Sequence, residues 1–182
     1  KCPPDIKPID YNIITKRLNL FPYQQLYFSS FRYGNLRAVF PDCATVQERK
    51  LSSLQTEEQI LLITGIASPD TIRELEIHTR NIDLLAFSDH HNFSQRDLAQ
   101  IKERFGKLRK GQRLIVTTEK DATRLICHQE LNEGLKPFIY ALPIEVEILQ
   151  NQQDNFNQHI IGYVRENTRN GSLPERKDAH KS

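Results

Sequence analysis

Asp89, His90 and His91 are the residues of this sequence with the clearest capacity for chemistry. They follow the apolar run 84–87 and precede a predicted helix start. Histidine is the side chain whose ordinary pKa lies in the physiological range, and a neighbouring carboxylate can hold it for proton transfer. This stretch alone leaves open a proton-transfer site, a metal site and a polar loop that caps the next helix.

Polar residues also follow two other predicted strands, at 60–64 and 114–117. They are Gly65 after the first strand, and Thr118, Glu119, Lys120 and Asp121 after the second. Because the carboxyl ends of parallel strands meet at one edge of a sheet, we expect these residues to lie near 88–91. A tight turn also explains Gly65, and helix capping with surface charge also explains 118–121.

The elements that position these residues follow from the apolar pattern. Strands are expected at 60–64, 84–87, 114–117 and 138–142, with a further one at 144–148. Helices are expected to begin at Pro69, after the cap Ser94 and after the cap Thr118. Alternating strands and helices predict an α/β fold with a mostly parallel sheet and right-handed crossovers.

The first 58 residues have a different pattern. A helix is expected to begin at Asp10 and to end before Pro22, and the β-rich segments 25–31 and 36–40 flank Gly34, which predicts a hairpin. We therefore divide the chain into 1–24, a connecting helix or the end of a preceding domain; 25–58, a hairpin linker and loop; 59–166, the α/β domain; and 167–182, a polar, disordered tail.

Composition excludes several classes of protein. The 182 residues carry a net charge of +2, which does not point to nucleic acid, and no apolar run approaches the roughly 20 residues of a membrane span. Three widely spaced cysteines without a CxxC pair favour neither zinc nor disulfides and fit a reducing, cytosolic compartment. The sequence starts at Lys1 and contains no methionine, so we expect it to be a fragment or a processed chain. It contains no GxxxxGK[ST] or GxGxxG phosphate loop.

Four motifs together resemble one known family. Residues 87–94, F-S-D-H-H-N-F-S, resemble the F-x-D-H-H-x-F-[ST] signature of the tetraacyldisaccharide 4'-kinases, the lipid A 4'-kinases. Residues 117–122, T-T-E-K-D-A, resemble that family's [MT]-T-E-K-D-A motif, and 65–69, G-I-A-S-P, its G-I-[AG]-x-P loop. The F-R-Y-G segment at 31–34 lies where the family has its β-rich linker, and the likeness covers roughly residues 1–166.

The resemblance implies a fold and a reaction. Enzymes of this family transfer the γ-phosphate of ATP, with Mg²⁺, to the 4'-hydroxyl of an acylated glucosamine disaccharide 1-phosphate in lipid A biosynthesis. They work at the cytoplasmic face of the inner membrane of Gram-negative bacteria and have two three-layer α/β/α domains, with the phosphate loop in the first. This chain would be the second domain with its linker, and would be inactive alone.

The resemblance also implies roles for the residues. His90 matches the histidine that handles the proton and pairs with an aspartate of the first domain, and Asp89 would orient its loop. The remaining candidates would support the site or lie near phosphate or substrate: His91, Gly65, Thr118, Glu119, Lys120 and Asp121. ATP and Mg²⁺ would be bound mainly by the first domain, and no metal ligands are assigned here.

Two other functions compete with this reading. Asp-His-His also names a family of metal-dependent phosphoesterases, but those enzymes hold two metals with further Asp and His clusters, and none precedes Asp89. The other alternative is a non-catalytic regulatory or interaction domain, which a gene without an upstream phosphate loop would favour.

Overall fold

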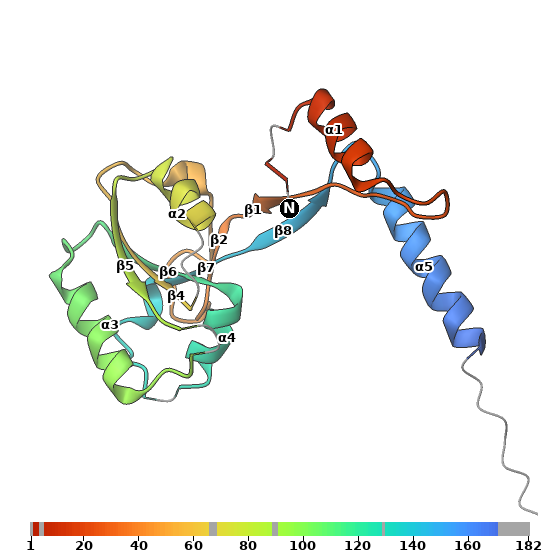
Figure 1. Cartoon of the computed structure of the whole chain (residues 1–182). Helices are drawn as coiled ribbons and strands as arrows, with labels where there is room; N and C mark the ends of the chain where they lie inside the picture. Colours follow the sequence, from red (N-terminus) through yellow and green to blue (C-terminus); the bar gives the residue numbers. More distant parts are fainter. Residues whose placement is uncertain (1, 4–5, 66–68, 89–90, 129, 171–182) are drawn as a thin grey trace, which may run out of the picture. The chain divides into compact units, whose positions relative to one another are not determined.

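The computed structural model of the chain describes residues 2–3, 6–65, 69–88, 91–128 and 130–170 (Figure 1). It divides into two compact units, a smaller one of residues 1–31 and 146–182 and a larger one of residues 32–145. The boundaries between the units fall within strands β1 (Ser29–Tyr33) and β8 (Ile144–Ile148), which pair with each other in a sheet of two strands.

The larger unit is built on a six-stranded sheet in the order β3-β2-β7-β6-β4-β5. The four strands β7, β6, β4 and β5 are parallel, and β2 runs antiparallel to both of its neighbours. The bounds of the strands are Leu36–Ala38 for β2, Glu48–Arg49 for β3, Gln59–Thr64 for β4, Asn81–Ala86 for β5, Arg113–Thr118 for β6 and Ile139–Leu142 for β7.

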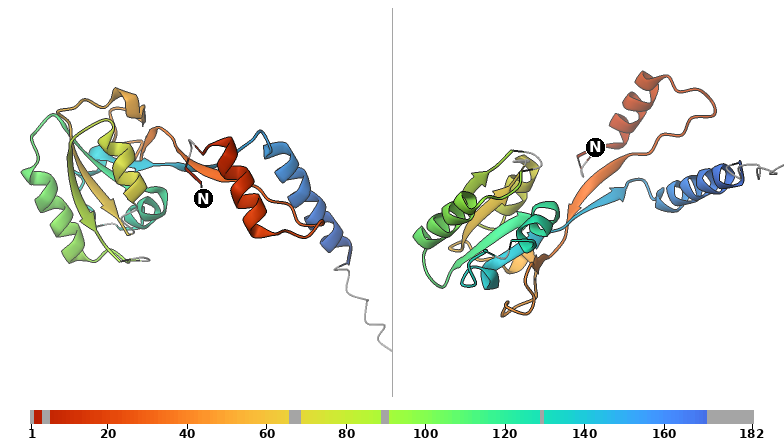
Figure 2. Two further views of the ribbon diagram at one scale, coloured as in Figure 1. Left: turned by 45° about the horizontal axis from the view of Figure 1, so that its top comes forward. Right: turned by 90° about the horizontal axis from the view of Figure 1, so that it is seen from below.

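Helices cover both faces of this sheet. Leu61 and Ile63 belong to the core under α3 (Gln95–Lys107) and α4 (Glu119–Ile126). Ile60 and Leu62 alternate with them and belong to a second core, under α2 (Pro69–Glu76) and the short helical turn Leu51–Ser53. The mostly parallel, three-layer α/β/α class is therefore confirmed (Figures 1 and 2).

The predicted helix starts of the larger unit are confirmed where the structure describes them. α2 begins at Pro69, Ser94 caps α3 with Asp97 reaching back, and the Thr118 hydroxyl caps α4. Strand β5 covers residues 81–86, three residues earlier than expected, because Ile82 also packs against the second core. The predicted cap Ser68 lies outside the described residues.

The predicted hairpin between 25–31 and 36–40 is wrong. β1 pairs with β8, while β2 joins the large sheet between β7 and β3. The Gly34 N–H donates to the Pro143 carbonyl at 3.0 Å. Gly34 therefore extends the pairing of β1 with the segment of β8, and it does not form a hairpin turn. Residues 144–148 form a strand as expected, but this strand belongs to the two-stranded sheet with β1 and not to the large sheet. Glu145 and Glu147 on it are exposed, which does not suit a sheet that is buried on both faces.

The smaller unit consists of α1 (Pro8–Leu18), α5 (Gln153–Asn170) and the segments that lead to β1 and from β8. α1 begins two residues before the predicted start, since Pro8 suits the first helical turn and the Asp10 carboxylate accepts from the Lys7 N–H at 3.2 Å. α5 continues to Asn170, so residues 167–170 are helical and not part of the predicted tail, whose remainder is outside the described residues. None of the described helices is long and apolar enough to cross a membrane.

Candidate functional site

The carboxyl ends of β4, β5 and β6 bring three loops together. In the parallel register Thr64 lies beside Ala86, and Ile63 lies beside Thr117. A Cβ atom placed on Gly65 would be 3.1 Å from the Ser88 carbonyl oxygen and 3.3 Å from Asp121 Oδ1. The predicted meeting of these loops at one edge of the sheet is therefore confirmed for the residues that the structure describes.

Asp121 ties two of these loops to each other. Its Oδ2 accepts from the Gly65 N–H and from the Thr118 hydroxyl, both at 2.9 Å, and its Oδ1 pairs with Arg124 at 3.2 Å. The Asp121 residue is only 3% exposed. A buried carboxylate is stable only when its oxygens are paired in this way, so Asp121 acts as a brace between the end of β4 and the start of α4.

His91 is fixed by contacts on several sides. Its ring stacks on Phe87 with a centroid distance of 4.7 Å and meets Phe93 edge-on at 5.6 Å. Its Nε2 lies 2.8 Å from Asp97 Oδ2, and its backbone N–H donates to the Ser88 carbonyl at 3.2 Å. The half-buried imidazole therefore anchors the end of this loop on α3.

Asp97 links that anchor to the start of the helix. Its Oδ2 also accepts from the Ser94 N–H and from the Ser94 hydroxyl, each at 2.7 Å. Burial alone would raise the pKa of Asp97, but the hydrogen bonds from Ser94 and His91, with the charge of His91, outweigh it and lower the pKa to about 2. Asp97 is thus a carboxylate at neutral pH, the form that accepts these bonds.

Two of the other predicted site residues are exposed, and two lie outside the described residues. Glu119 and Lys120 are exposed at the first turn of α4, beside the half-buried cap Thr118. Asp89 and His90, the predicted catalytic pair, lie outside the described residues, although Ser88 and His91 on either side of them are described. The described part of the chain contains no group of three or more His, Cys, Asp or Glu side chains that could hold a metal ion.

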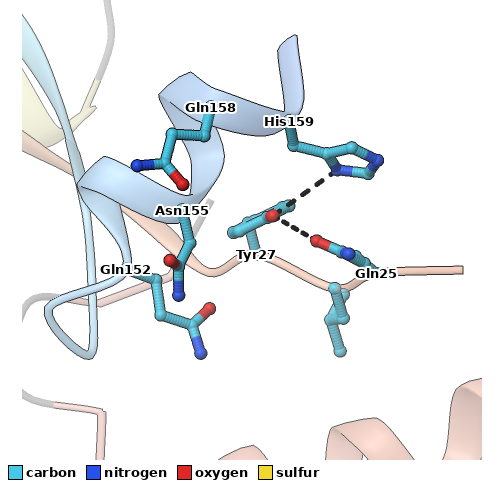
Figure 3. Close-up of a pocket in the computed structure, with 7 residues that line it drawn as sticks. Gln25, Tyr27, Gln152, Asn155, Gln158 and His159 are labelled. Carbon is cyan, nitrogen blue, oxygen red and sulfur yellow. Dashed lines mark hydrogen bonds between the residues drawn. The ribbon is translucent and has the colours of Figure 1, made fainter. Parts of the chain in front are cut away.

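A polar pocket of the smaller unit was not predicted. It has a volume of about 600 Å³ and is lined by Gln25, Leu26, Tyr27, Gln152, Asn155, Gln158 and His159. Figure 3 shows the Tyr27 hydroxyl between His159, whose Nδ1 is 3.5 Å away, and Gln25, whose amide oxygen accepts from it. Tyr27 and His159 are 132 residues apart in the sequence, so only the pairing of β1 with β8 could have revealed that they lie together.

The sequence also matches known proteins. Residues 15–165 match the family model described as LpxK, tetraacyldisaccharide-1-P 4'-kinase. The chain belongs to the tetraacyldisaccharide-1-P 4'-kinase family. The match covers more than half of the chain, and it includes all three loops of the candidate site.

Relatives of this 4'-kinase family occur in several bacteria. The whole chain aligns with tetraacyldisaccharide 4'-kinases of Bacteroides fragilis at 99% identity and of Bacteroides thetaiotaomicron at 71%, in each case over 49% of the relative. One from Porphyromonas gingivalis is 31% identical over 90% of the chain and 45% of the relative. The chain thus spans about half the length of the curated relatives it matches.

Among solved structures, the crystal structure of the apo form of LpxK from Aquifex aeolicus in complex with ATP is similar at a TM-score of 0.46 and 14% identity. The alignment of the two structures covers 80% of this chain and 38% of the Aquifex aeolicus protein.

Proposed function

We propose that this chain is the C-terminal part of an ATP-dependent lipid kinase. The whole enzyme transfers the γ-phosphate of ATP to the 4'-hydroxyl of tetraacyldisaccharide 1-phosphate, a step of lipid A biosynthesis. The observation that carries the proposal is the meeting of Gly65, Ser88 and Asp121 at one sheet edge, in a chain of the 4'-kinase family. That edge joins the loop with the D-H-H motif to the start of the T-E-K-D motif.

His90 is the residue to which we assign the proton of the attacking hydroxyl. Phosphoryl transfer depends mainly on positioning and on charge stabilisation, with one group that accepts or orients that proton. Asp89 orients the loop, and His91 supports it. The contacts of His91 with Phe87 and Asp97 support this division, because they commit the His91 ring to anchoring the loop.

Gly65, Thr118 and Asp121 act in this proposal by positioning. Asp121 holds the Gly65 N–H and the Thr118 hydroxyl, and the absence of a side chain at Gly65 lets the Ser88 carbonyl approach. Glu119 and Lys120 are exposed at the same edge, where we place the phosphate groups and the sugar of the substrate. We assign the roles of these two residues from the family motif and from their location alone.

ATP and Mg²⁺ are assigned to the half of the kinase that this chain does not span. Both oxygens of Asp121 already accept from Gly65, Thr118 and Arg124, so this carboxylate is not free to bind Mg²⁺. The described residues contain no group of three or more His, Cys, Asp or Glu side chains that could hold a metal ion. Because the proposed acceptor is a lipid, we place the enzyme as a peripheral protein on the cytoplasmic face of the inner membrane of Gram-negative bacteria.

The test is a phosphoryl-transfer assay with radiolabelled ATP and the acylated disaccharide 1-phosphate. The full-length Bacteroides fragilis relative should transfer the label, and the 182-residue chain alone should not. In the full-length relative, substitution of the residue aligned with His90, His90→Ala, should lower kcat by about 10²–10⁴-fold, the usual contribution of an acid–base group.

His78→Ala is the matched control for that variant. His78 follows α2 and precedes β5, at the amino ends of the parallel strands and so at the edge opposite to the candidate site. It should leave kcat unchanged. ATP-dependent turnover by the 182-residue chain, or unchanged turnover in His90→Ala, would contradict the proposal.

A further inference from the structure

Asp97 makes one contact more than the cap of its helix requires. A capping box needs an acceptor at the third helical position, and Asp97 Oδ2 supplies it to the Ser94 backbone N–H at 2.7 Å. The same oxygen also accepts from the Ser94 hydroxyl at 2.7 Å and lies 2.8 Å from His91 Nε2. The contact with His91 is no part of a capping box, so the cap alone does not account for it.

The chemistry of the two groups gives that contact its direction. An ionised carboxylate can only accept hydrogen bonds, so the hydrogen is on the Nε2 atom of His91. The side chain of Asp97 is 17% exposed, and three donors converge on its Oδ2. Hydrogen bonds to an ionised acceptor are roughly twice as strong as bonds between neutral groups. Asp97 therefore fixes where the Nε2 edge of the His91 ring points.

Aromatic neighbours restrict the same ring on its other sides. Phe87 lies against its face, with the two planes 18° apart and the centroids 4.7 Å apart. Phe93 meets the ring at 86° and is itself buried in the core under α3 and α4. The His91 ring is thus held by α3 through Asp97 and by the core through Phe93.

The position of His91 sets one end of the segment that carries Asp89 and His90. The His91 backbone N–H donates to the Ser88 carbonyl at 3.2 Å, so these two ends are held together across the residues between them. A displacement of the His91 ring therefore moves one end of that segment relative to the other. Asp97, which holds the ring, is on the first turn of α3 and not on the segment itself.

We propose that Asp97 is a positioning residue for phosphoryl transfer, and that it acts through the His91 imidazole on the segment that carries His90. The proposal rests on the proposed function, in which His90 handles the proton of the attacking hydroxyl. Reaction rates depend steeply on the placement of such a group, and a displacement of about 1 Å can cost about 100-fold. A smaller displacement, after the loss of one side-chain contact, should cost about tenfold in kcat.

Steady-state phosphoryl transfer by the full-length Bacteroides fragilis relative tests this role. Asp97→Asn keeps an acceptor oxygen for the cap but removes the charge that holds His91, and it should lower kcat about tenfold with the KM for ATP within about twofold of the parent. His91→Phe keeps a ring for stacking on Phe87 and should lower kcat to a similar extent. The double variant should be at most about twofold slower than the slower single variant, because both changes break the same link.

Asp97→Glu keeps the test decisive if Asp97→Asn does not fold. Glutamate at this position makes the usual form of the capping box, so the start of α3 should remain intact. Its carboxylate is displaced by one methylene from the place that His91 requires, and kcat should still fall at least about threefold. A folded Asp97→Glu variant with the kcat of the parent would overturn the proposal.

Ser94→Ala and Asp83→Asn are matched controls for the stability of α3. Ser94→Ala removes the cap hydroxyl and leaves the His91–Asp97 contact in place. Asp83→Asn weakens the attachment of α3 to β5, because Asp83 Oδ2 accepts from Arg104 Nε at 3.0 Å. Both variants should lower Tm and leave kcat within about twofold of the parent at a temperature where they are folded. If either lowers kcat as much as Asp97→Asn, the effect comes from helix stability and the proposal is overturned.

Nitrogen NMR of the full-length relative with ¹⁵N-labelled histidine tests the link without any need for turnover. The signal of neutral His91, identified by its loss in His91→Phe, should be that of the Nε2–H tautomer. In Asp97→Asn it should move towards a mixture with the Nδ1–H tautomer, and in Asp83→Asn it should not move. If the parent transfers no phosphate, the proposed function fails while the ring signal still tests the link. An Nδ1–H tautomer in the parent, an unchanged kcat in folded Asp97→Asn, or losses that multiply in the double variant would overturn the role of Asp97.

Discussion

Removing the Asp121 carboxylate should destabilise the larger unit more than any surface substitution. In Asp121→Ala the Gly65 N–H loses its 2.9 Å acceptor, and Arg124 loses its 3.2 Å ion pair with Asp121. The Thr118 hydroxyl also loses an acceptor, although it can still accept from the backbone N–H of residue 121. The end of β4 and the start of α4 would then no longer be joined.

The size of the effect follows from the burial of each group. A buried donor without an acceptor costs about 1–3 kcal/mol. Arg124 retains 22% of its side-chain exposure and can turn to water, so the loss of its ion pair adds roughly 1 kcal/mol and not the several kcal/mol of a fully buried pair. We expect a loss of about 3 kcal/mol in the free energy of unfolding, or roughly 10 °C in Tm.

Urea unfolding of the 182-residue chain, followed by circular dichroism, measures this loss. Asp121→Asn keeps the shape and one acceptor oxygen, and should lose about 2 kcal/mol. Glu119→Gln is the matched control, because it changes an exposed carboxylate of the same helical turn, and it should stay within about 0.5 kcal/mol of the parent. A stability of Asp121→Ala within about 0.5 kcal/mol of the parent would refute the role of Asp121 as a brace.

Two further substitutions test the contacts around the site. Gly65→Ala should lower the free energy of unfolding in urea by about 1–3 kcal/mol, because the new Cβ would lie 3.1 Å from the Ser88 carbonyl oxygen. Gly106→Ala is the control and should instead stabilise α3, because a Cβ there has nothing within 4 Å. Equal effects of the two substitutions would contradict the close approach of Gly65 to Ser88. The pKa of Asp97 is lowered from 3.8 to about 2 in the folded chain, so its contribution to stability is present above pH 4 and lost as the pH falls towards 2. Asp97→Asn should reduce the fall of Tm between about pH 4 and about pH 2. If Tm falls by the same amount in this variant as in the parent, the pairing of Asp97 with Ser94 and His91 is contradicted.

Much of the larger unit could be predicted from local sequence. Continuous apolar runs marked the parallel strands, and Ser94 and Thr118 were recognisable as caps because a cap and its partner are three residues apart. The same local signal showed Asp121 at the start of a helix. It could not show that Asp121 also binds the Gly65 N–H, because that contact spans 56 residues and exists only once β4 and β6 are paired.

The linker could not be predicted for a related reason. Gly34 between two β-rich segments is typical of a hairpin, yet neither local pattern nor glycine content shows that β8, more than 100 residues later, is the partner of β1.

His91 could be predicted in part. Its partner Asp97 is only six residues away, so the capping box of Ser94 and Asp97 close to His91 would have indicated the His91–Asp97 pair. The stacking of His91 on Phe87 could not be predicted, because it depends on the turn between these two residues.

The proposed site is tested most directly by steady-state phosphoryl transfer in the full-length Bacteroides fragilis relative that carries Asp121→Asn, at a temperature where the variant remains folded. If Asp121 positions the loop with the D-H-H motif, kcat should fall by at least about 10-fold, since small displacements of reacting groups are costly. The KM for ATP should stay within about twofold, because we assign ATP to the other half of the enzyme. A folded variant with unchanged kcat, or with a defect confined to the KM for ATP, would contradict the assignment of this sheet edge to the catalytic site.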